Sequence, residues 1–133
     1  MKRIILSAAI MLLSFAYVSA QDKAFKNPNA PVITFEKLIH NYGDLAYGSN
    51  GVCEFEFTNT GKTPLILQRP RSSCGCTVPD WPREPIMPGK SAKIKVTYDT
   101  KKIGVINKSV TIISNARNKA VILKVKGKVL PKR

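Results

Sequence analysis

The sequence predicts an all-β protein: an immunoglobulin-like antiparallel β-sandwich of about seven strands that follows a cleaved N-terminal signal peptide. Three observations support this fold class. Apolar and polar residues alternate with a period of two in segment after segment, no window repeats apolar residues at the spacing of an amphipathic helix, and turn-forming residues separate the segments. A small barrel is the alternative, and a parallel α/β sheet is disfavoured because nothing alternates with helices.

Residues 1–20 have the pattern of a secretory signal peptide. Lys2 and Arg3 precede an apolar run over residues 4–17, and Ala20 ends a small-x-small cleavage pattern. The run is shorter than the roughly 20 residues that cross a bilayer as a helix, which disfavours the alternative of a retained anchor. We therefore expect cleavage after Ala20, export to the periplasm or the extracellular space, and no stable transmembrane anchor.

The mature chain is predicted to be a short linker and one domain. Residues 21–31 are polar and interrupted by proline, which is typical of a flexible linker, and the sandwich domain is expected over residues 32–130. The formal net charge of +14 falls to about +12 without Lys2 and Arg3. Such a charge favours association with anionic partners but does not determine a fold.

Six segments are predicted as strands. In the clearest three, one face is apolar and the other is polar, so one side is expected to enter the core. The predicted strands are VITF (32–35), VCEFEFT (52–58), PLILQ (64–68), AKIKVTY (92–98), SVTIIS (109–114) and VILKVKGKV (121–129). Turn residues such as Asn59-Thr60-Gly61 and Pro88-Gly89 separate them.

Residues that support enzyme chemistry are few. His40 is the single histidine and lies in LIHNYGDL, a predicted loop or strand end, where a structural role is favoured over a catalytic one. The sequence has no G-x-S-x-G nucleophile motif and no glycine-rich phosphate loop. We therefore predict no catalytic residues and no enzyme activity.

Five lysines alternate with apolar residues on two predicted strands: Lys93, Lys95, Lys124, Lys126 and Lys128. They are a candidate polyanion surface, for which anionic envelope polymers are the expected partners. The alternative is that they are solvated strand faces that discourage aggregation, and this alternative is favoured. Nucleic acid is disfavoured as a partner because the signal peptide removes the chain from the nucleoid and no aromatic residues lie among the lysines.

The three cysteines, Cys53, Cys74 and Cys76, cannot all pair within one exported chain. A hairpin between residues 53–58 and 64–69 would place Cys53 opposite Pro70, within reach of Cys74 or Cys76 if the chain folds back. Either bridge would stabilise the fold by about 3 kcal/mol.

The rival pairing joins Cys74 to Cys76 around Gly75, which tolerates the backbone that such a small ring requires. As thiols, Cys74 and Cys76 would be a redox pair or two ligands for Cu(I), the one metal cofactor that the sequence suggests. Structural, redox and metal interpretations all remain open at this stage. Prolines after the pair stiffen the segment, and Trp81 is expected to pack over the end of the sandwich.

The sequence resembles the bacterial domain-of-unknown-function family DUF1573 over about residues 33–129. The segments that carry the resemblance are F-x-K-L-x-H-x-Y-G (35–43), F-x-F-T-N-T-G-K-T-P-L (55–65), S-S-C-G-C-T-V-P-x-W (72–81), P-I-M-P-G-K (85–90), I-K-V-T-Y-D-T (94–100) and I-I-S-N (112–115). The resemblance implies a Hydin-type immunoglobulin-like sandwich and an exported bacterial protein. It implies no activity.

These observations favour an exported non-enzymatic module that binds an envelope protein or an anionic polymer. The alternative is a thiol-dependent protein that uses Cys74-Gly75-Cys76 for copper binding or disulfide exchange.

Overall fold

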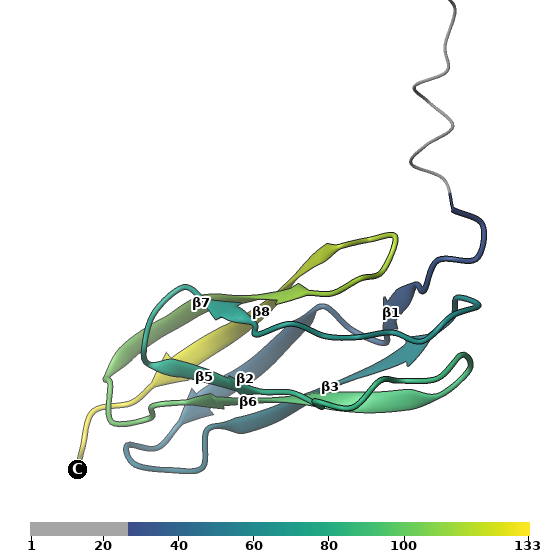
Figure 1. The fold of residues 1–133 in the computed structure, drawn as a ribbon. Coiled ribbons are helices and arrows are strands. Elements are labelled where there is room, and N and C mark those ends of the chain that lie inside the picture. Colours follow the sequence, from purple (N-terminus) through teal and green to yellow (C-terminus); the bar gives the residue numbers. More distant parts are fainter. Residues whose placement is uncertain (1–26) are drawn as a thin grey trace, which may run out of the picture.

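The computed structural model describes residues 27–133, which form two four-stranded β-sheets (Figure 1). One sheet has the strand order β1-β3-β6-β5 and the other β2-β8-β7-β4. The strands are β1 (Ile33–Phe35), β2 (Ile39–Leu45), β3 (Val52–Asn59), β4 (Arg71–Ser72), β5 (Thr77–Asp80), β6 (Ser91–Tyr98), β7 (Gly104–Ile113) and β8 (Ala120–Val129). Neighbouring strands pair antiparallel, except that β2 runs parallel to β8. This architecture confirms the predicted β-sandwich.

The core lies between the two sheets and is formed by the apolar faces that the alternation predicted. Phe55 and Phe57 of β3, Ile94 of β6 and Leu123 of β8 are all at most 1% exposed. Full burial of side chains of this size stabilises the fold by about 1.5–3 kcal/mol each. The residues between them on the same strands, including the lysines, point outward.

The segment around His40 corrects the prediction of a loop or strand end, because it is strand β2. Its apolar residues do not alternate cleanly: Ile39 faces outward and is 51% exposed, whereas the polar side chains of His40 and Tyr42 face inward and are partly buried. The strand is held at the edge of its sheet by parallel pairing with β8. A bulge between Asn41 and Asp44 further obscures the pattern.

Residues 64–68 correct a second prediction, because they are not a strand. Leu65 forms a single bridge to Ile86, which precedes β6, and Leu67 forms a single bridge to Ser114, which follows β7. The segment therefore crosses from one sheet to the other and buries both leucines on the way. The hairpin expected between residues 53–58 and 64–69 is absent, since β3 pairs with β1 and β6.

Asn59 joins several turns at one end of the sandwich. Its side chain is fully buried, and its amide nitrogen donates to the carbonyl oxygens of Thr63 at 2.8 Å and Ile86 at 2.9 Å. Its side-chain oxygen accepts from the backbone N–H of Gly61 at 3.0 Å. A buried amide is stable in the core when its donors and acceptor are satisfied in this way.

The predicted signal peptide (residues 1–20) and residues 21–26 of the predicted linker lie outside the described part of the chain. Residues 27–31 contact the sandwich: the Thr63 hydroxyl donates to the carbonyl of Asn29, and the Arg117 guanidinium donates to that of Asn27. Between residues 27 and 133, no helix has the length and hydrophobicity needed to cross a membrane.

Candidate functional site

The segment that contains Cys74 and Cys76 links the two sheets along one side of the sandwich. It leaves β4, the edge strand of one sheet, and enters β5, the edge strand of the other. The Ser73 N–H donates to the carbonyl of Ser109 on β7 at 2.9 Å, and the Asp99 N–H donates to the carbonyl of Cys76 at 2.9 Å. Both ends of this disulfide corner, residues 73–77, are therefore fixed to the sheets.

The structure pairs Cys74 with Cys76 in a disulfide whose Cα atoms are 5.4 Å apart, and leaves Cys53 as a buried thiol. Of the two pairings that the sequence left open, this is the one between Cys74 and Cys76, and the strand order explains why Cys53 forms no bridge. Cys53 on β3 lies opposite Val96 on β6, and Val96 lies opposite Pro79 on β5. Cys53 is thus about 10 Å from β5 across two strand spacings, whereas a disulfide requires Cα atoms within about 7 Å.

The two sulfur atoms of the disulfide differ in exposure. Cys76 is 7% exposed, whereas Cys74 is partly exposed and Gly75 is exposed. The hydroxyl oxygen of Thr77, itself buried, lies 3.9 Å from both sulfur atoms. Cys74 is therefore the more exposed cysteine of the pair.

An open groove of about 690 Å³ lies along the disulfide corner. Arg69 and Arg83 contribute two cationic side chains to the groove. Trp81 contributes an aromatic ring, and Val78 contributes an exposed apolar side chain. The Arg83 guanidinium stacks at 3.7 Å from the centre of the Trp81 ring, a geometry in which the ring face stabilises the cation. Among residues 27–133, no acidic side chain lines this groove, so the groove is electrostatically suited to an anionic ligand.

The free edge of β5 lies beside the groove and has few backbone donors. Since the Cys76 carbonyl accepts from β6, alternation directs the backbone groups of Val78 and Asp80 to β6 and those of Thr77 and Pro79 to the free edge. Proline has no N–H, and the N–H of Thr77 already donates to the carbonyl of Cys74. A ligand in the groove would therefore contact side chains rather than extend the sheet.

Trp81 is partly buried and packs against the core. Arg69 and Arg83 were not predicted as site residues. The available signal was their position on either side of the C-G-C segment, but spacing alone does not show that both side chains line one groove.

Cys53 and Tyr42 form a second cluster, inside the sandwich and away from the groove. The Tyr42 hydroxyl donates to the carbonyl of Gly51 at 2.6 Å and lies 3.4 Å from the Cys53 sulfur. Burial raises the pKa of the Cys53 thiol and strongly raises the pKa of Tyr42. Both groups are therefore neutral at neutral pH, which makes the Cys53 thiol a poor nucleophile.

His40 packs against Tyr42 of this cluster, with the two ring centres 4.7 Å apart. Burial, followed by the charge of Lys37, lowers the pKa of His40. The Lys37 amino group lies 3.0 Å from Nδ1 of the ring, and a lysine ammonium only donates, so Nδ1 accepts. In the sheet order, β2 and β4 are at opposite edges, about 14 Å apart over three strand spacings. His40 is therefore too far from the groove to act as a base there.

Alkaline pH is expected to destabilise the fold through Cys53. Burial raises the pKa of the Cys53 thiol in the folded chain above the value of about 8.5 in the unfolded chain. The contribution of the neutral thiol to stability is therefore complete below about pH 8.5 and is lost as the pH rises through the folded pKa. The free energy of unfolding in urea should therefore fall above about pH 8.5, and fall less in Cys53→Ala. Identical pH dependence in the two proteins would show that the thiol stays unperturbed.

The five predicted surface lysines do not form one surface. Lys93 and Lys95 are on β6 in the first sheet, whereas Lys124, Lys126 and Lys128 are on β8 in the second, and the two sets point outward on opposite sides of the sandwich. The physical reason is that each set faces away from the same shared core.

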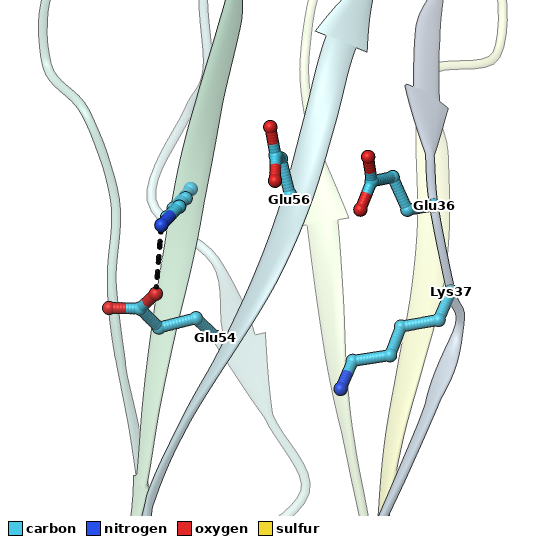
Figure 2. A pocket seen from close by; sticks show the side chains of 5 residues that line it. Glu36, Lys37, Glu54 and Glu56 are labelled. Atoms are coloured by element: carbon cyan, nitrogen blue, oxygen red, sulfur yellow. Dashed lines mark ion pairs between the residues drawn. The ribbon is translucent and has the colours of Figure 1, made fainter.

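Carboxylates surround the first set. Lys93 lies opposite Glu56 and its amino group is 3.3 Å from a carboxylate oxygen of Glu54, while Lys95 lies opposite Glu54 and Asp80. Figure 2 shows a pocket in which Glu36 and Lys37 lie on one segment, Glu54 and Glu56 lie on β3, and a dashed line marks the ion pair of Glu54. These carboxylates neutralise the lysines, so this face is not a polyanion surface.

The described chain holds no group of three or more His, Cys, Asp or Glu side chains that could bind a metal ion. While Cys74 and Cys76 are bonded to each other, neither sulfur is a thiolate. Ligation of Cu(I) by this pair would therefore belong to the reduced form of the chain.

Residues 33–129 match the model of a family described as "Protein of unknown function (DUF1573)". The chain belongs to this family. The match confirms the resemblance that the sequence motifs indicated and covers all eight strands of the sandwich. None of the curated proteins matches the sequence of this chain.

Several solved structures share the fold of this family member. A protein of unknown function from Porphyromonas gingivalis W83 is 21% identical with a TM-score of 0.68, over 81% of this chain and 51% of that one. The PapD-like domain 7 of human CEP192 is 10% identical with a TM-score of 0.63, over 92% and 99% of the two chains. The periplasmic chaperone SfaE is 10% identical with a TM-score of 0.56, over 75% and 59%. The chain thus spans about half the length of the P. gingivalis protein, and these likenesses show the fold alone.

Proposed function

We propose that this chain is an exported, non-enzymatic β-sandwich module that binds an acidic segment of another envelope protein in the groove beside the disulfide corner. The observation that carries the proposal is the groove itself, which Arg69, Arg83 and Trp81 line and whose described lining residues include no carboxylate. Export is supported by the pattern of residues 1–20. One fold neighbour, SfaE, is a periplasmic chaperone, which is consistent with that compartment.

The ligand chemistry follows from the side chains of the groove. Guanidinium groups bind carboxylates through short, charge-assisted hydrogen bonds, and often through two at once. The Trp81 ring and the Val78 side chain together add apolar contact area to the groove. The side of the groove formed by the disulfide corner is fixed, because the corner is hydrogen bonded to Ser109 on β7 and to Asp99, which follows β6. A preorganised site loses less conformational entropy when a ligand binds.

A non-enzymatic role is supported by the chemistry near the groove. The chain has a single histidine, and it lies on the opposite edge strand of its sheet. No carboxylate, the other side chain that commonly serves as an acid or base, is among the residues that line the groove within the described part of the chain. Binding is therefore the function that this site supports best.

Charge reversal at Arg69 and Arg83 is expected to weaken binding of an oligoglutamate peptide about 100-fold, because two charge-assisted contacts are replaced by repulsion. The measurement is a titration of the purified chain by fluorescence of Trp81, its only tryptophan. The matched control is Lys62→Glu with Lys119→Glu, which removes the same charge at exposed positions outside the groove. Equal weakening in the two double variants would show that net charge, and not the groove, binds the peptide.

A second candidate function is disulfide exchange, favoured by the observation that Gly75, which lies between the bonded Cys74 and Cys76, lines the groove and that Cys74 is the more exposed of the two cysteines. A substrate thiolate would attack the Cys74 sulfur, the bond to Cys76 would break, and Cys76 would leave as a thiolate. A second substrate thiolate would then attack the substrate sulfur of the mixed disulfide and release Cys74, so that the substrate is oxidised and the pair is reduced.

This candidate is tested with a reduced dithiol peptide and the oxidised chain. In Cys76→Ser whose Cys74 thiol has been activated beforehand, mass spectrometry should detect a mixed disulfide between Cys74 and the peptide. The wild type and Cys53→Ala should both oxidise the peptide. Peptide oxidation at the same rate with Cys74→Ser would exclude exchange at this pair.

A further inference from the structure

The outer faces of the two sheets have opposite charge. On the first sheet, three carboxylates (Glu54, Glu56, Asp80) face outward beside two lysines (Lys93, Lys95). On the second sheet, the outward cations are Arg71, Lys124, Lys126 and Lys128, and among the described strand residues only Asp44 opposes them. The second face therefore carries a net positive charge, whereas the first is slightly negative.

The positive face also exposes branched aliphatic side chains. Val105 on β7 is 76% exposed, Ile122 on β8 is 54% exposed and Ile39 on β2 is 51% exposed. The pairing places Val105 opposite Lys128, and Ile39 opposite Lys124. The basic face, defined here as Ile39, Val105, Ile122, Lys124, Lys126 and Lys128, thus mixes cationic and apolar side chains on one sheet.

The lysines are regularly spaced along a central strand. Lys124, Lys126 and Lys128 follow one another at every second residue of β8, so their Cα atoms are about 7 Å apart. β8 lies between β2 and β7, and all three lysines are exposed. A broad partner of negative charge can contact all three at once.

We propose that the basic face docks onto the surface of an anionic phospholipid bilayer. Charge complementarity favours an anionic partner, and the exposed aliphatic side chains favour a bilayer over a fully hydrated polymer, because a bilayer offers apolar contact beneath its headgroups. This role goes beyond the proposed function. The groove lies at the β4–β5 side of the sandwich, and so stays accessible while the basic face is in contact with lipid.

The experiment is co-sedimentation of the purified chain with vesicles of phosphatidylcholine and phosphatidylglycerol, against vesicles of phosphatidylcholine alone. Replacement of Lys124, Lys126 and Lys128 by glutamine should weaken binding to the anionic vesicles about 100-fold, and added salt should weaken binding of the wild type. The matched control, Lys90→Gln with Lys93→Gln and Lys95→Gln, removes the same charge from β6 of the first sheet and from the residue before it, and should retain most of the binding.

The apolar side chains separate a bilayer from other anionic partners. Val105→Thr with Ile122→Thr should weaken vesicle binding without changing the binding of soluble polyphosphate. The proposal is overturned if the two triple lysine variants lose vesicle binding equally, or if the aliphatic replacements have no effect on it. It is also overturned if the basic face instead mediates self-association, seen as a mass that rises with protein concentration in the absence of lipid and falls in Lys124→Gln with Lys126→Gln and Lys128→Gln.

Discussion

Replacement of Asn59 by aspartate is expected to lower the free energy of unfolding by about 2–5 kcal/mol at neutral pH. The Asn59 amide nitrogen donates to the carbonyl oxygens of Thr63 and Ile86 in a site with no solvent exposure. Aspartate places an oxygen where that nitrogen lies, so two donors are lost and a buried negative charge faces two carbonyl groups. Urea denaturation followed by circular dichroism measures the loss.

The pH dependence of Asn59→Asp gives a second test. Burial and the neighbouring carbonyls should hold the pKa of the new carboxyl above its ordinary value of about 3.9. Stability is then greatest below that unfolded value and is lost as the pH rises through the folded pKa. The matched control is Asn115→Asp, because Asn115 also donates to a carbonyl, that of Pro64 at 3.2 Å, but is exposed. Equal losses in both variants would contradict the importance of burial.

The alternation of apolar and polar residues was enough to predict the central strands. In β3, β6 and β8 every predicted inward position is buried or partly buried, because these strands have one face on the core and one in solvent. The same alternation did not correctly predict the segments at the edges of the sheets. Residues 64–68 satisfy the same pattern with Leu65 and Leu67 while crossing between the sheets, and β2 buries polar side chains at His40 and Tyr42.

The candidate site was only partly visible in the sequence for a topological reason. The segment around Cys74 and Cys76 stood out by its motif, but the strand order decides which residues surround it. The insertion of β6 between β3 and β5 separates Cys53 from the pair. The distribution of Lys93 and Lys124 over different sheets likewise follows from topology and not from spacing.

Consecutive backbone hydrogen bonds connect the disulfide corner to the end of β6, and the end of β6 to Gly51. The backbone N–H of Tyr98 donates to the carbonyl of Gly51 at 2.9 Å, and the next residue, Asp99, donates its N–H to the carbonyl of Cys76. A shift of this part of β6 away from β3 therefore also moves the anchor of the corner.

Replacement of Gly51 by alanine is expected to lower the free energy of unfolding by about 3 kcal/mol. A Cβ atom at this position would overlap the carbonyl oxygen of Tyr98 and lie 2.9 Å from the Thr100 methyl group. Because the overlapping atom belongs to the backbone, the clash is relieved only by separating β3 from β6. The measurements are urea denaturation and the rate at which dithiothreitol reduces the Cys74–Cys76 disulfide.

Gly75→Ala is the matched control, because a Cβ atom at Gly75 would have no neighbour within 4 Å. It should leave the free energy of unfolding nearly unchanged, although it lies inside the disulfide ring itself. Reduction should be faster in Gly51→Ala, where the hydrogen bond between Asp99 and Cys76 is displaced, than in Gly75→Ala, where that bond is intact. The opposite order would mean that the corner is held by its own small ring and not by its attachment to β6, and the groove would then lose the rigid side on which its binding function depends.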